Sequence, residues 1–418
     1  MIIQKYDSYK NLDIEFIGDI PHSWGVKRIK EVFWKFGSGS TPKAGNPNYY
    51  ENANINWLNT TDLNNSEVYE TKEKVTQKAV EDYSLQVYPI NSMAMAMYGQ
   101  GKTRGMVGIL KIKTTTNQAS CIMSNIKNGF QLRYILWNLI SKYDVLRSIN
   151  TGTTQPNMNQ DFIRNSCLVI PSEKEQTQIY LFLDEKTSQI DSKIKLLQDK
   201  ISSYEELKKT LISETVCRGL NKNVELKDSE IEWIGKIPKH WKKIRGKNIF
   251  SELPKSKISA SEGEDNGKYK FFTSSVNQSK WLNTFNENSE EIIFSTGGIA
   301  GVHYCDQKFS YSTDCWALES NKEHLKYYYY YFKSIIYEID TIGFKGAGLE
   351  HLQRDFITHN SLPNPPKSEQ IQIAKYLDEK TSRIDKIISK IDDQITTLTE
   401  FRKTLINDVV TGKVRVVG

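Results

Sequence analysis

Apolar residues recur at a spacing of seven in two long stretches of the chain. In the first stretch these residues are Leu183, Ile190, Leu197, Tyr204 and Leu211, with Ile194 and Ile201 at the alternate stripe position. In the second they are Leu377, Ile384, Ile391, Leu398 and Leu405, joined by Ile388 and Ile395. A sustained stripe of this kind predicts helices that pair with one another. Two equal stripes in one chain can pack against each other within that chain. The alternative is a coiled coil between two copies of the chain.

The starts of the two helices carry their own signals. Ser172 and Glu175 have the spacing of a capping box, and Pro366 suits the first turn of the second helix. About 40 residues at 1.5 Å each predict rods of roughly 60 Å. Between the helices the pattern changes, because "NSMAMAMYGQGKTRGMVGILKIKTTT" and "EIIFSTGGIAGVHYCDQKFSYST" alternate apolar and polar residues around glycines. Those segments predict strands and turns.

The chain repeats itself. "EQTQIYLFLDEKTSQIDSKI" from Glu175 returns as "EQIQIAKYLDEKTSRIDKII" from Glu369, an offset of 194, and "IEFIGDIPHSWGVKRIKEVF" from Ile14 returns from Ile231, an offset of 217. Each half is therefore a shared leader, an insert of its own and a shared helix. The inserts cover about 34–150 and 251–344. Each ends in a helical stretch, "LRYILWNLISKYDVLRSI" and "LKYYYYYFKSIIYEIDTI", which we align at the same offset of 194. The tyrosines in the second predict a packed helix face, and a stacking platform is the alternative.

The expected fold class follows from these patterns. It is α/β (α+β), with two mixed β-rich domains joined by two long coiled-coil helices in an internal repeat. The expected boundaries are 1–171 for the first domain, 172–216 for the first long helix, 217–365 for the second domain, and 366–418 for the second helix and a C-terminal tail.

Composition narrows the class of protein. No apolar run reaches the roughly 20 residues of a membrane span, and the first residues lack the apolar core of a signal peptide, so we expect a cytoplasmic protein. The 5 cysteines are scattered without any CxxC pair, which predicts reduced thiols rather than a disulfide frame or a zinc site. The net charge is +6, but the first insert has 13 Lys+Arg against 8 Asp+Glu and the second has 9 against 13. Bulk charge therefore favours a nucleic-acid partner only for the first insert.

Two motifs resemble catalytic signatures, but the first lies in the wrong structural context and the second is incomplete. "AMYGQGKT" fits a loose phosphate-binding loop, yet "RGMVGILKIK" follows it as a predicted strand, where such a loop must open a helix. "NPNYY" and "NPPK" are each incomplete versions of the Asn-Pro-Pro-aromatic motif of amino-methyltransferases. The 6 histidines show no ligand spacing, so we predict no metal site and no catalytic residue.

The glycine-rich turn offers groups that bind DNA instead. Gln100, Lys102, Thr103 and Arg104 can hydrogen-bond base edges and phosphates. The alternative is a solvated hairpin tip.

Together these features resemble the specificity subunit of type I restriction-modification enzymes. The resemblance rests on the doubled "EQ…LDEKTS…ID" phrase, on the leaders "IPHSW" and "IPKHW", and on "GSGSTPK…YYENANINWLNTTDL". It implies two target-recognition domains that each read one half of a bipartite, asymmetric DNA target. The two long coiled-coil helices would then be antiparallel, hold the domains apart and give the chain a pseudo-twofold axis. It also implies that the chain holds two methyltransferase subunits and the restriction subunit. Pro-Pro-Lys-Ser in place of Pro-Ser-Glu-Lys before the second helix, and the acidic second insert, depart from this picture.

The resemblance also implies where the chemistry resides. S-adenosylmethionine is expected in the methyltransferase subunit, and ATP and Mg²⁺ in the restriction subunit, with no cofactor in this chain. Further candidate DNA contacts are Lys43, Tyr98, Thr154, Gln155, Asn157, Lys255, Lys257, Ser274, Ser275, Thr296 and His303. Two other functions remain open, a non-catalytic coiled-coil adaptor for proteins and a nucleotide-binding ATPase.

Overall fold

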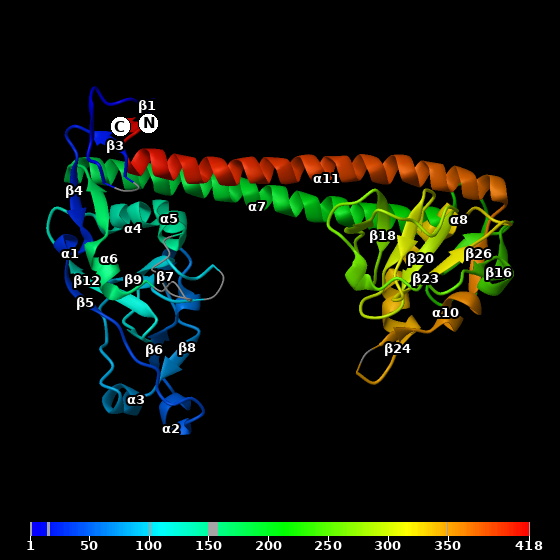
Figure 1. Cartoon of the computed structure of the whole chain (residues 1–418), viewed down its shortest axis with the longest axis horizontal. Helices are drawn as coiled ribbons and strands as arrows, with labels where there is room; N and C mark the ends of the chain where they lie inside the picture. The colour runs from blue at the N-terminus through cyan, green and yellow to red at the C-terminus, as the bar shows by residue number, and fades with distance from the viewer. Residues whose placement is uncertain (1, 15–16, 100–101, 149–157, 349, 418) are drawn as a thin grey trace. The chain divides into compact units, whose positions relative to one another are not determined.

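The computed structural model describes residues 2–14, 17–99, 102–148, 158–348 and 350–417. It divides into two compact units (Figure 1). The first unit contains 1–196 and 394–418, and the second contains 197–393. Both long helices, α7 (Glu173–Arg218) and α11 (Lys367–Val410), contribute residues to each unit.

Each unit begins with short strands that cover the start of a long helix. In the first unit these are β2 (Tyr9–Asn11), β3 (Asp19–Pro21) and β4 (Gly25–Arg28). In the second they are β14 (Leu226–Asp228), β15 (Lys236–Pro238) and β16 (Lys242–Arg245). The six strands follow the offset of 217 found in the sequence. In the first unit β1 (Ile2–Gln4) also pairs antiparallel with β27 (Arg415–Val417), which joins the two ends of the chain.

Four strands of the larger sheet have the same order in both inserts, and the first insert adds a fifth strand. In the first unit the order is β5-β12-β9-β10-β7, and in the second it is β17-β23-β20-β21. The strands of the first are β5 (Phe33–Gly37), β12 (Ser120–Ile126), β9 (Met93–Ala96), β10 (Val107–Leu110) and β7 (Ser66–Val68). The strands of the second are β17 (Ser251–Glu252), β23 (Cys315–Glu319), β20 (Glu291–Ser295) and β21 (Val302–Cys305). The inserts therefore share a fold although their sequences differ.

A smaller three-stranded sheet extends each insert. Its order is β11-β6-β8 in the first unit and β22-β18-β19 in the second, with one parallel and one antiparallel pairing in each. The strands are β11 (Thr115–Thr116), β6 (Ile55–Leu58), β8 (Glu73–Val75), β22 (Phe309–Tyr311), β18 (Tyr269–Phe272) and β19 (Lys280–Leu282). The first unit adds the short helices α2 (Pro47–Tyr50) and α3 (Gln77–Asp82) here.

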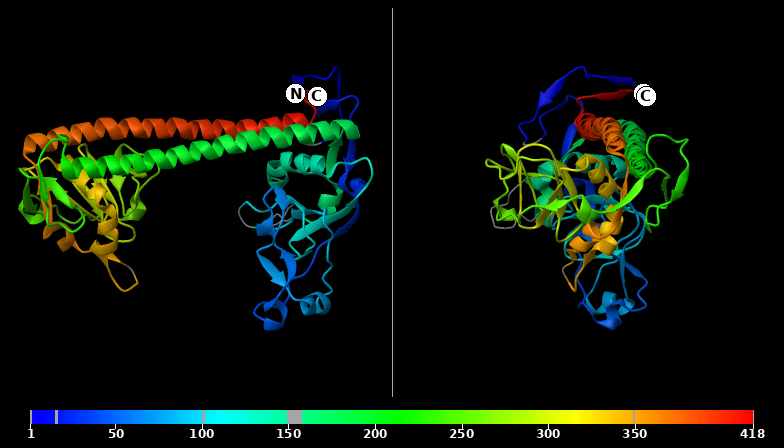
Figure 2. Two further views of the ribbon diagram at one scale, coloured as in Figure 1. Left: turned by 180° about the vertical axis from the view of Figure 1, so that it is seen from behind. Right: turned by 90° about the vertical axis from the view of Figure 1, so that its right-hand side faces the viewer.

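Helices connect the inserts to the long helices. The first insert ends in α4 (Leu132–Ser141) and α5 (Tyr143–Ser148), and α6 (Gln160–Asn165) and β13 (Cys167–Ile170) lead into α7. The second insert ends in α8 (Leu325–Ser334) and α9 (Ile336–Glu338), followed by β24 (Phe344–Lys345), β25 (His351–Leu352), α10 (Arg354–Thr358) and β26 (Ser361–Asn364). Within each unit α4 or α8 lies along the long helices, as both views show (Figures 1 and 2).

The predicted stripe on the long helices is confirmed. None of its fourteen residues is exposed, and Leu183 and Leu377 are fully buried. Leu196 and Leu207 lie off the stripe and are 68% and 52% exposed. The predicted capping box is present too, because the amide of Glu175 donates to Oγ of Ser172 at 3.3 Å and the amide of Ser172 donates to the Glu175 carboxylate at 3.4 Å.

The repeated phrase is explained by contacts inside each unit. Trp24 of the first leader donates its indole N–H to Glu175 at 3.4 Å, and Trp241 donates to Glu369 at 2.9 Å. The buried side-chain oxygens of Gln176 and Gln370 each accept the backbone N–H of the residue just before α4 or α8, at 2.8 and 2.9 Å. The phrase recurs because each copy must hold its own leader and its own insert.

One sequence alignment was wrong by a residue. Asp184 accepts from Arg133 and Trp137 of α4, and Asp378 accepts from Lys326 and Tyr330 of α8. Asp184 and Asp378 are 194 apart, whereas Arg133 and Lys326 are 193 apart. The chain between the insert helix and the long helix is therefore one residue longer in the second unit, a difference that an ungapped comparison cannot register.

Other sequence expectations are confirmed. Four of the five tyrosines of α8 are buried, so they form a packed helix face. All five cysteines are free thiols. Among the described residues no helix is both long and apolar enough to cross a bilayer.

Candidate nucleic-acid interface

Polar loops gather at one end of the larger sheet in the first unit. The amide of Met97 donates to the carbonyl of Ala119 at 2.8 Å, and that of Gly39 donates to the carbonyl of Asn117 at 3.0 Å. Next to them, Oγ1 of Thr41 donates to the exposed side chain of Gln118 at 2.7 Å. Hydroxyl and amide groups held this way can face the edges of bases.

The β9–β10 turn belongs to this end of the sheet. A bond of 3.0 Å from the Met106 amide to the Thr103 carbonyl closes the turn, and Gly105 has φ of 85°, which favours glycine. The Lys102 side chain is exposed, while Thr103 and Arg104 are half-buried. The guanidinium of Arg104 donates to the carbonyl of Arg147 at the end of α5. Lys102 thus faces solvent, and Arg104 also holds the turn against α5.

The other first-unit candidates are more dispersed. Tyr98 is half-buried, and its amide donates to Ala119 at 3.4 Å. Lys43 is exposed on a separate loop, which its amide ties to the Tyr83 hydroxyl at 2.9 Å. The candidates Gln100, Thr154, Gln155 and Asn157 lie outside the described residues.

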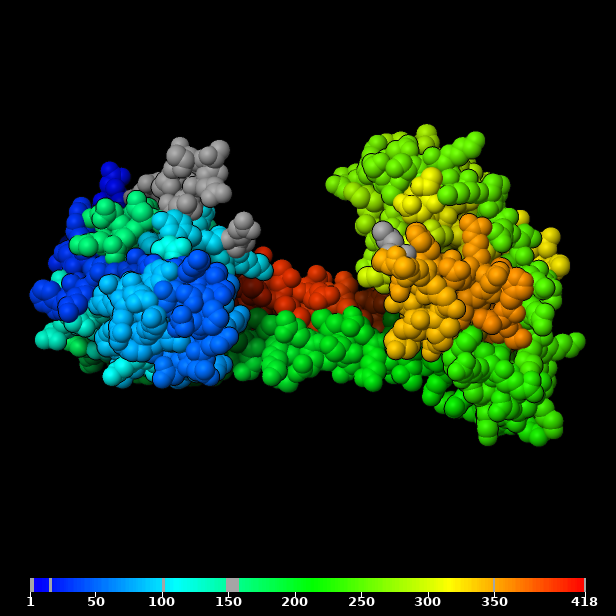
Figure 3. Space-filling view, turned by 90° about the horizontal axis from the view of Figure 1, so that it is seen from below, coloured from blue at the N-terminus to red at the C-terminus, as the bar shows by residue number. Residues whose placement is uncertain are grey.

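The second unit builds its own polar end from equivalent segments. The amide of Thr296 donates to the carbonyl of Asp314 at 2.9 Å, and that of Thr313 donates to Ile258 at 2.8 Å, beside the exposed Lys255 and Lys257. The β24–β25 hairpin joins them, since the Leu352 amide donates to the Thr296 carbonyl at 3.1 Å. Figure 3 shows the orange surface of this hairpin region beside the yellow surface of the neighbouring strands.

His303 supports this end of the sheet from within. It is only 9% exposed, and its Nε2 lies 2.9 Å from the carbonyl of Ser275. Burial lowers the pKa of His303, so the ring is neutral at pH 7. Ser275 is exposed and Ser274 half-buried. His303 therefore fixes the loop that presents the two serines.

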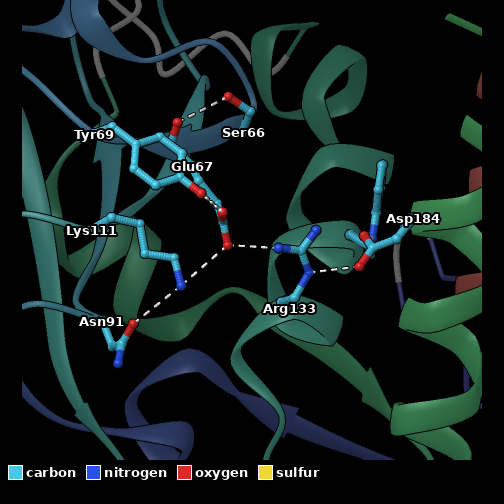
Figure 4. A network of polar contacts seen from close by, with 8 residues as sticks. Ser66, Glu67, Tyr69, Asn91, Lys111, Arg133 and Asp184 are labelled. Carbon is cyan, nitrogen blue, oxygen red and sulfur yellow. Dashed lines mark hydrogen bonds and ion pairs between the residues drawn. The ribbon is translucent and has the colours of Figure 1, made fainter. Parts of the chain in front are cut away.

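An ionic network fixes the first insert to its long helix (Figure 4). Glu67 of β7 pairs with Lys111 at 3.2 Å and with Arg133 of α4 at 2.6 Å. Arg133 also pairs with Asp184 of α7 at 2.7 Å. Partial burial raises the pKa of Glu67, but hydrogen bonds from Tyr69 and Lys111 and the charge of Arg133 outweigh it and lower the pKa. The larger sheet of the first unit is thus held to the repeated phrase through charged groups.

The described residues contain no cluster of three or more His, Cys, Asp or Glu side chains that could hold a metal ion. The strand predicted after "GQGKT" is confirmed as β10, so this loop does not open a helix. The arrangement suits recognition by hydrogen bonds and charge.

Several residues of the two polar ends were missed by sequence reasoning. Thr41, Asn117 and Gln118 come together only through the fold, and nothing in their local sequence marks them. His351 is different, because the offset of 194 places it at the position of Asn157. Applying the repeat to that candidate would have found it.

The chain matches a known protein family in both halves. The model of the type I restriction modification DNA specificity domain matches residues 21–202 and again 238–397. The two matches correspond to the two sequence repeats.

Curated relatives and solved structures agree with this match. The putative type I restriction enzyme MjaX specificity subunit of Methanocaldococcus jannaschii is 24% identical, over 100% of this chain and 99% of the relative. The MjaIX specificity subunit of that organism is 27% identical, over 96% and 95%. A chain from a structural study of type I R-M complex assembly and conformational transition has a TM-score of 0.71 at 12% identity, covering 94% of this chain and 98% of that one. The HsdS subunit of Thermoanaerobacter tengcongensis has a TM-score of 0.51 at 13% identity, covering 94% and 98%.

Proposed function

The chain belongs to the type I restriction modification DNA specificity family, and we propose that each of its units reads one half of a bipartite, asymmetric DNA target. In the same proposal the chain is the scaffold for two methyltransferase subunits and for restriction subunits. S-adenosylmethionine would act in the methyltransferase subunits, and ATP with Mg²⁺ in the restriction subunits. This chain would contribute recognition and no catalytic group.

One observation carries the proposal. Two inserts of different sequence share the order of four strands in the larger sheet and are held by equivalent contacts to a repeated helical phrase. Side chains at the polar end differ, with Lys102, Thr41 and Gln118 in the first unit and Lys255, Lys257 and His351 in the second. A shared frame with different reading groups supports one target made of two different halves.

The acidic second insert does not contradict this proposal. Its polar end presents Lys255 and Lys257 as exposed side chains, whereas several of its carboxylates are engaged within the unit. Glu252, for example, accepts from Arg354 and from Trp316. Local charge at the loops, rather than the sum over the insert, decides whether phosphates can approach.

The experiment is to express the chain with its methyltransferase subunits and to map methylated bases across the host genome by single-molecule sequencing. We expect one motif of two specified parts separated by a constant number of unspecified base pairs. A control culture expresses the methyltransferase subunits alone. A continuous motif, or methylation that does not depend on this chain, would contradict the proposal.

A further inference from the structure

The two sheets differ by one strand. In the first unit 14 residues connect β6 to β8, and three of them form β7, the last strand of the larger sheet. In the second unit only 7 residues connect β18 to β19, and they form no strand. The larger sheet of the second unit therefore ends at β21, which occupies the position of β10.

In the first unit β7 pairs with the outer edge of β10 and provides partners for its backbone hydrogen-bonding groups. The strands are parallel, with Glu67 opposite Ile109. The Lys111 amide donates to the carbonyl of Val68 at 2.9 Å, and the Val107 amide donates to the side chain of Asn65 at 3.0 Å. In the second unit the residues equivalent to Val107 and Ile109 are Val302 and Tyr304. Within the described parts of the chain, neither has a backbone partner on that edge. Unpaired strand edges readily add another strand.

A groove borders this edge of the second unit. It has a volume of about 1040 Å³ and is lined by Tyr304 of β21, by α8 and by the long helices. Five cations and three anions line it: Lys208, Lys326, Lys333, Arg383 and Lys386 against Asp378, Glu379 and Asp385. The equivalent groove of the first unit has about 570 Å³, three cations and three anions, and one of those anions is Glu67. A strand added to the second unit would thus fill part of this larger groove and bring negative charge to it.

Lys333 gives the clearest indication that this groove can accept a further charged group. It is half-buried beside the groove, and among the described residues it has no ion-pair or hydrogen-bond partner. Burial and the neighbouring charge of Lys208 lower the pKa of Lys333. An incoming carboxylate would favour the charged form of Lys333 and so oppose both effects.

We propose that the edge of β21 and this groove bind an extended acidic segment of a partner polypeptide, which adds a parallel strand as β7 does in the first unit. The carboxylate of the segment lies opposite Tyr304 and reaches Lys326 and Lys333, as Glu67 reaches Arg133. The chain thereby carries the pattern of its ligand in its own sequence, "NNSEVYE" from Asn64 to Glu70. A polypeptide fits better than a nucleic-acid strand because only a polypeptide can continue the hydrogen-bond ladder of a sheet.

The test uses the full chain and a fluorescent, end-blocked peptide of sequence NNSEVYE. Anisotropy at low salt should show saturable binding. Replacing the first glutamate of the peptide by glutamine, or methylating the backbone nitrogen of its valine, should each weaken binding at least fivefold. Hydrogen–deuterium exchange should show protection of 302–306 in the bound chain.

Variants of the chain localise the site. Lys333→Met should weaken the peptide at least fivefold, and Lys247→Met, an exposed lysine outside the groove, should leave the affinity unchanged. Thermal melting confirms that both variants fold, and the glutamine peptide tests the charge without any change in the chain. The proposal falls if binding is not saturable or if 302–306 stays unprotected. It falls equally if a duplex oligonucleotide displaces the peptide, because the groove would then be a phosphate site.

Discussion

The carboxylate of Asp191 lies 2.8 Å from Nε of Arg402, an ion pair that joins α7 to α11 inside the first unit. The second unit contains the same pair between equivalent positions, since Lys208 lies 2.6 Å from Asp385. Asp191 and Asp385 are 194 residues apart, and so are Lys208 and Arg402. Each repeated helix therefore supplies the acid of one pair and the base of the other. This exchange requires both copies to keep the same phrase in one antiparallel register.

The first prediction concerns Asp184. Replacing Asp184 by alanine leaves the indole N–H of Trp137 and the guanidinium of Arg133 without their carboxylate, and Trp137 is only 6% exposed. We expect the free energy of unfolding to fall by about 1–3 kcal/mol. Asp191→Ala is the matched control on the same helix face. Its pair is partly exposed, so its loss should cost less than about 1 kcal/mol. Urea unfolding measures both, and equal losses would contradict the special role of Asp184.

Sequence reasoning found the features that depend on local spacing. The seven-residue stripe, the capping box at Ser172 and the doubled phrase are properties of neighbouring residues on a helix, so period alone reveals them. The sheet order and the approach of Thr41 to Gln118 come from pairings distant in sequence. The existence of β7 depends on the length of one connection, and the contact of Arg104 with the Arg147 carbonyl depends on where α5 lies. No local pattern encodes these.

The second prediction concerns pH. Glu291 is fully buried, one of its carboxylate oxygens has no hydrogen-bond partner, and burial raises the pKa of Glu291 to about 7. The folded chain therefore favours the protonated acid more than the unfolded chain, whose pKa is 4.5. The resulting stability is complete below pH 4.5 and is lost as pH rises through 7. Glu291→Gln should remove this slope, as thermal melts from pH 5 to 8 can show. If the variant keeps the pH dependence of the parent chain, a group other than Glu291 causes that dependence.

The third prediction separates two residues of the β9–β10 turn. Lys102 is exposed and suits a phosphate contact, so Lys102→Ala should weaken binding uniformly across DNA sequences. It should also reduce the slope of log K against log salt concentration by about one. Arg104→Ala should cost roughly 1–3 kcal/mol and relax the preference at one base pair if its guanidinium reads guanine. Filter binding to a randomised target library, with the methyltransferase subunits present, gives both values. If the arginine variant keeps the parent affinity and site preference, Arg104 only holds the turn against α5.

The last prediction is that the first insert can be exchanged on its own, provided that its attachment to α7 is preserved. A chimera that replaces 34–150 by the corresponding segment of another family member should change one half of the methylated motif and leave the other half intact. The structure adds a condition, because Arg133 and Trp137 lie within the exchanged segment and dock on Asp184 outside it.

Two chimeras therefore test the attachment of the insert to α7 as well as the exchange of the insert itself. One keeps an arginine and a tryptophan at these positions, and the other carries alanine at both. We expect the first to methylate a hybrid target, because the new sheet is held as the old one was. The second should lose methylation at the hybrid target or lower its melting temperature, since the new insert is no longer fixed to the helix. Changes in both halves of the motif in the first chimera would show that the units do not read DNA independently.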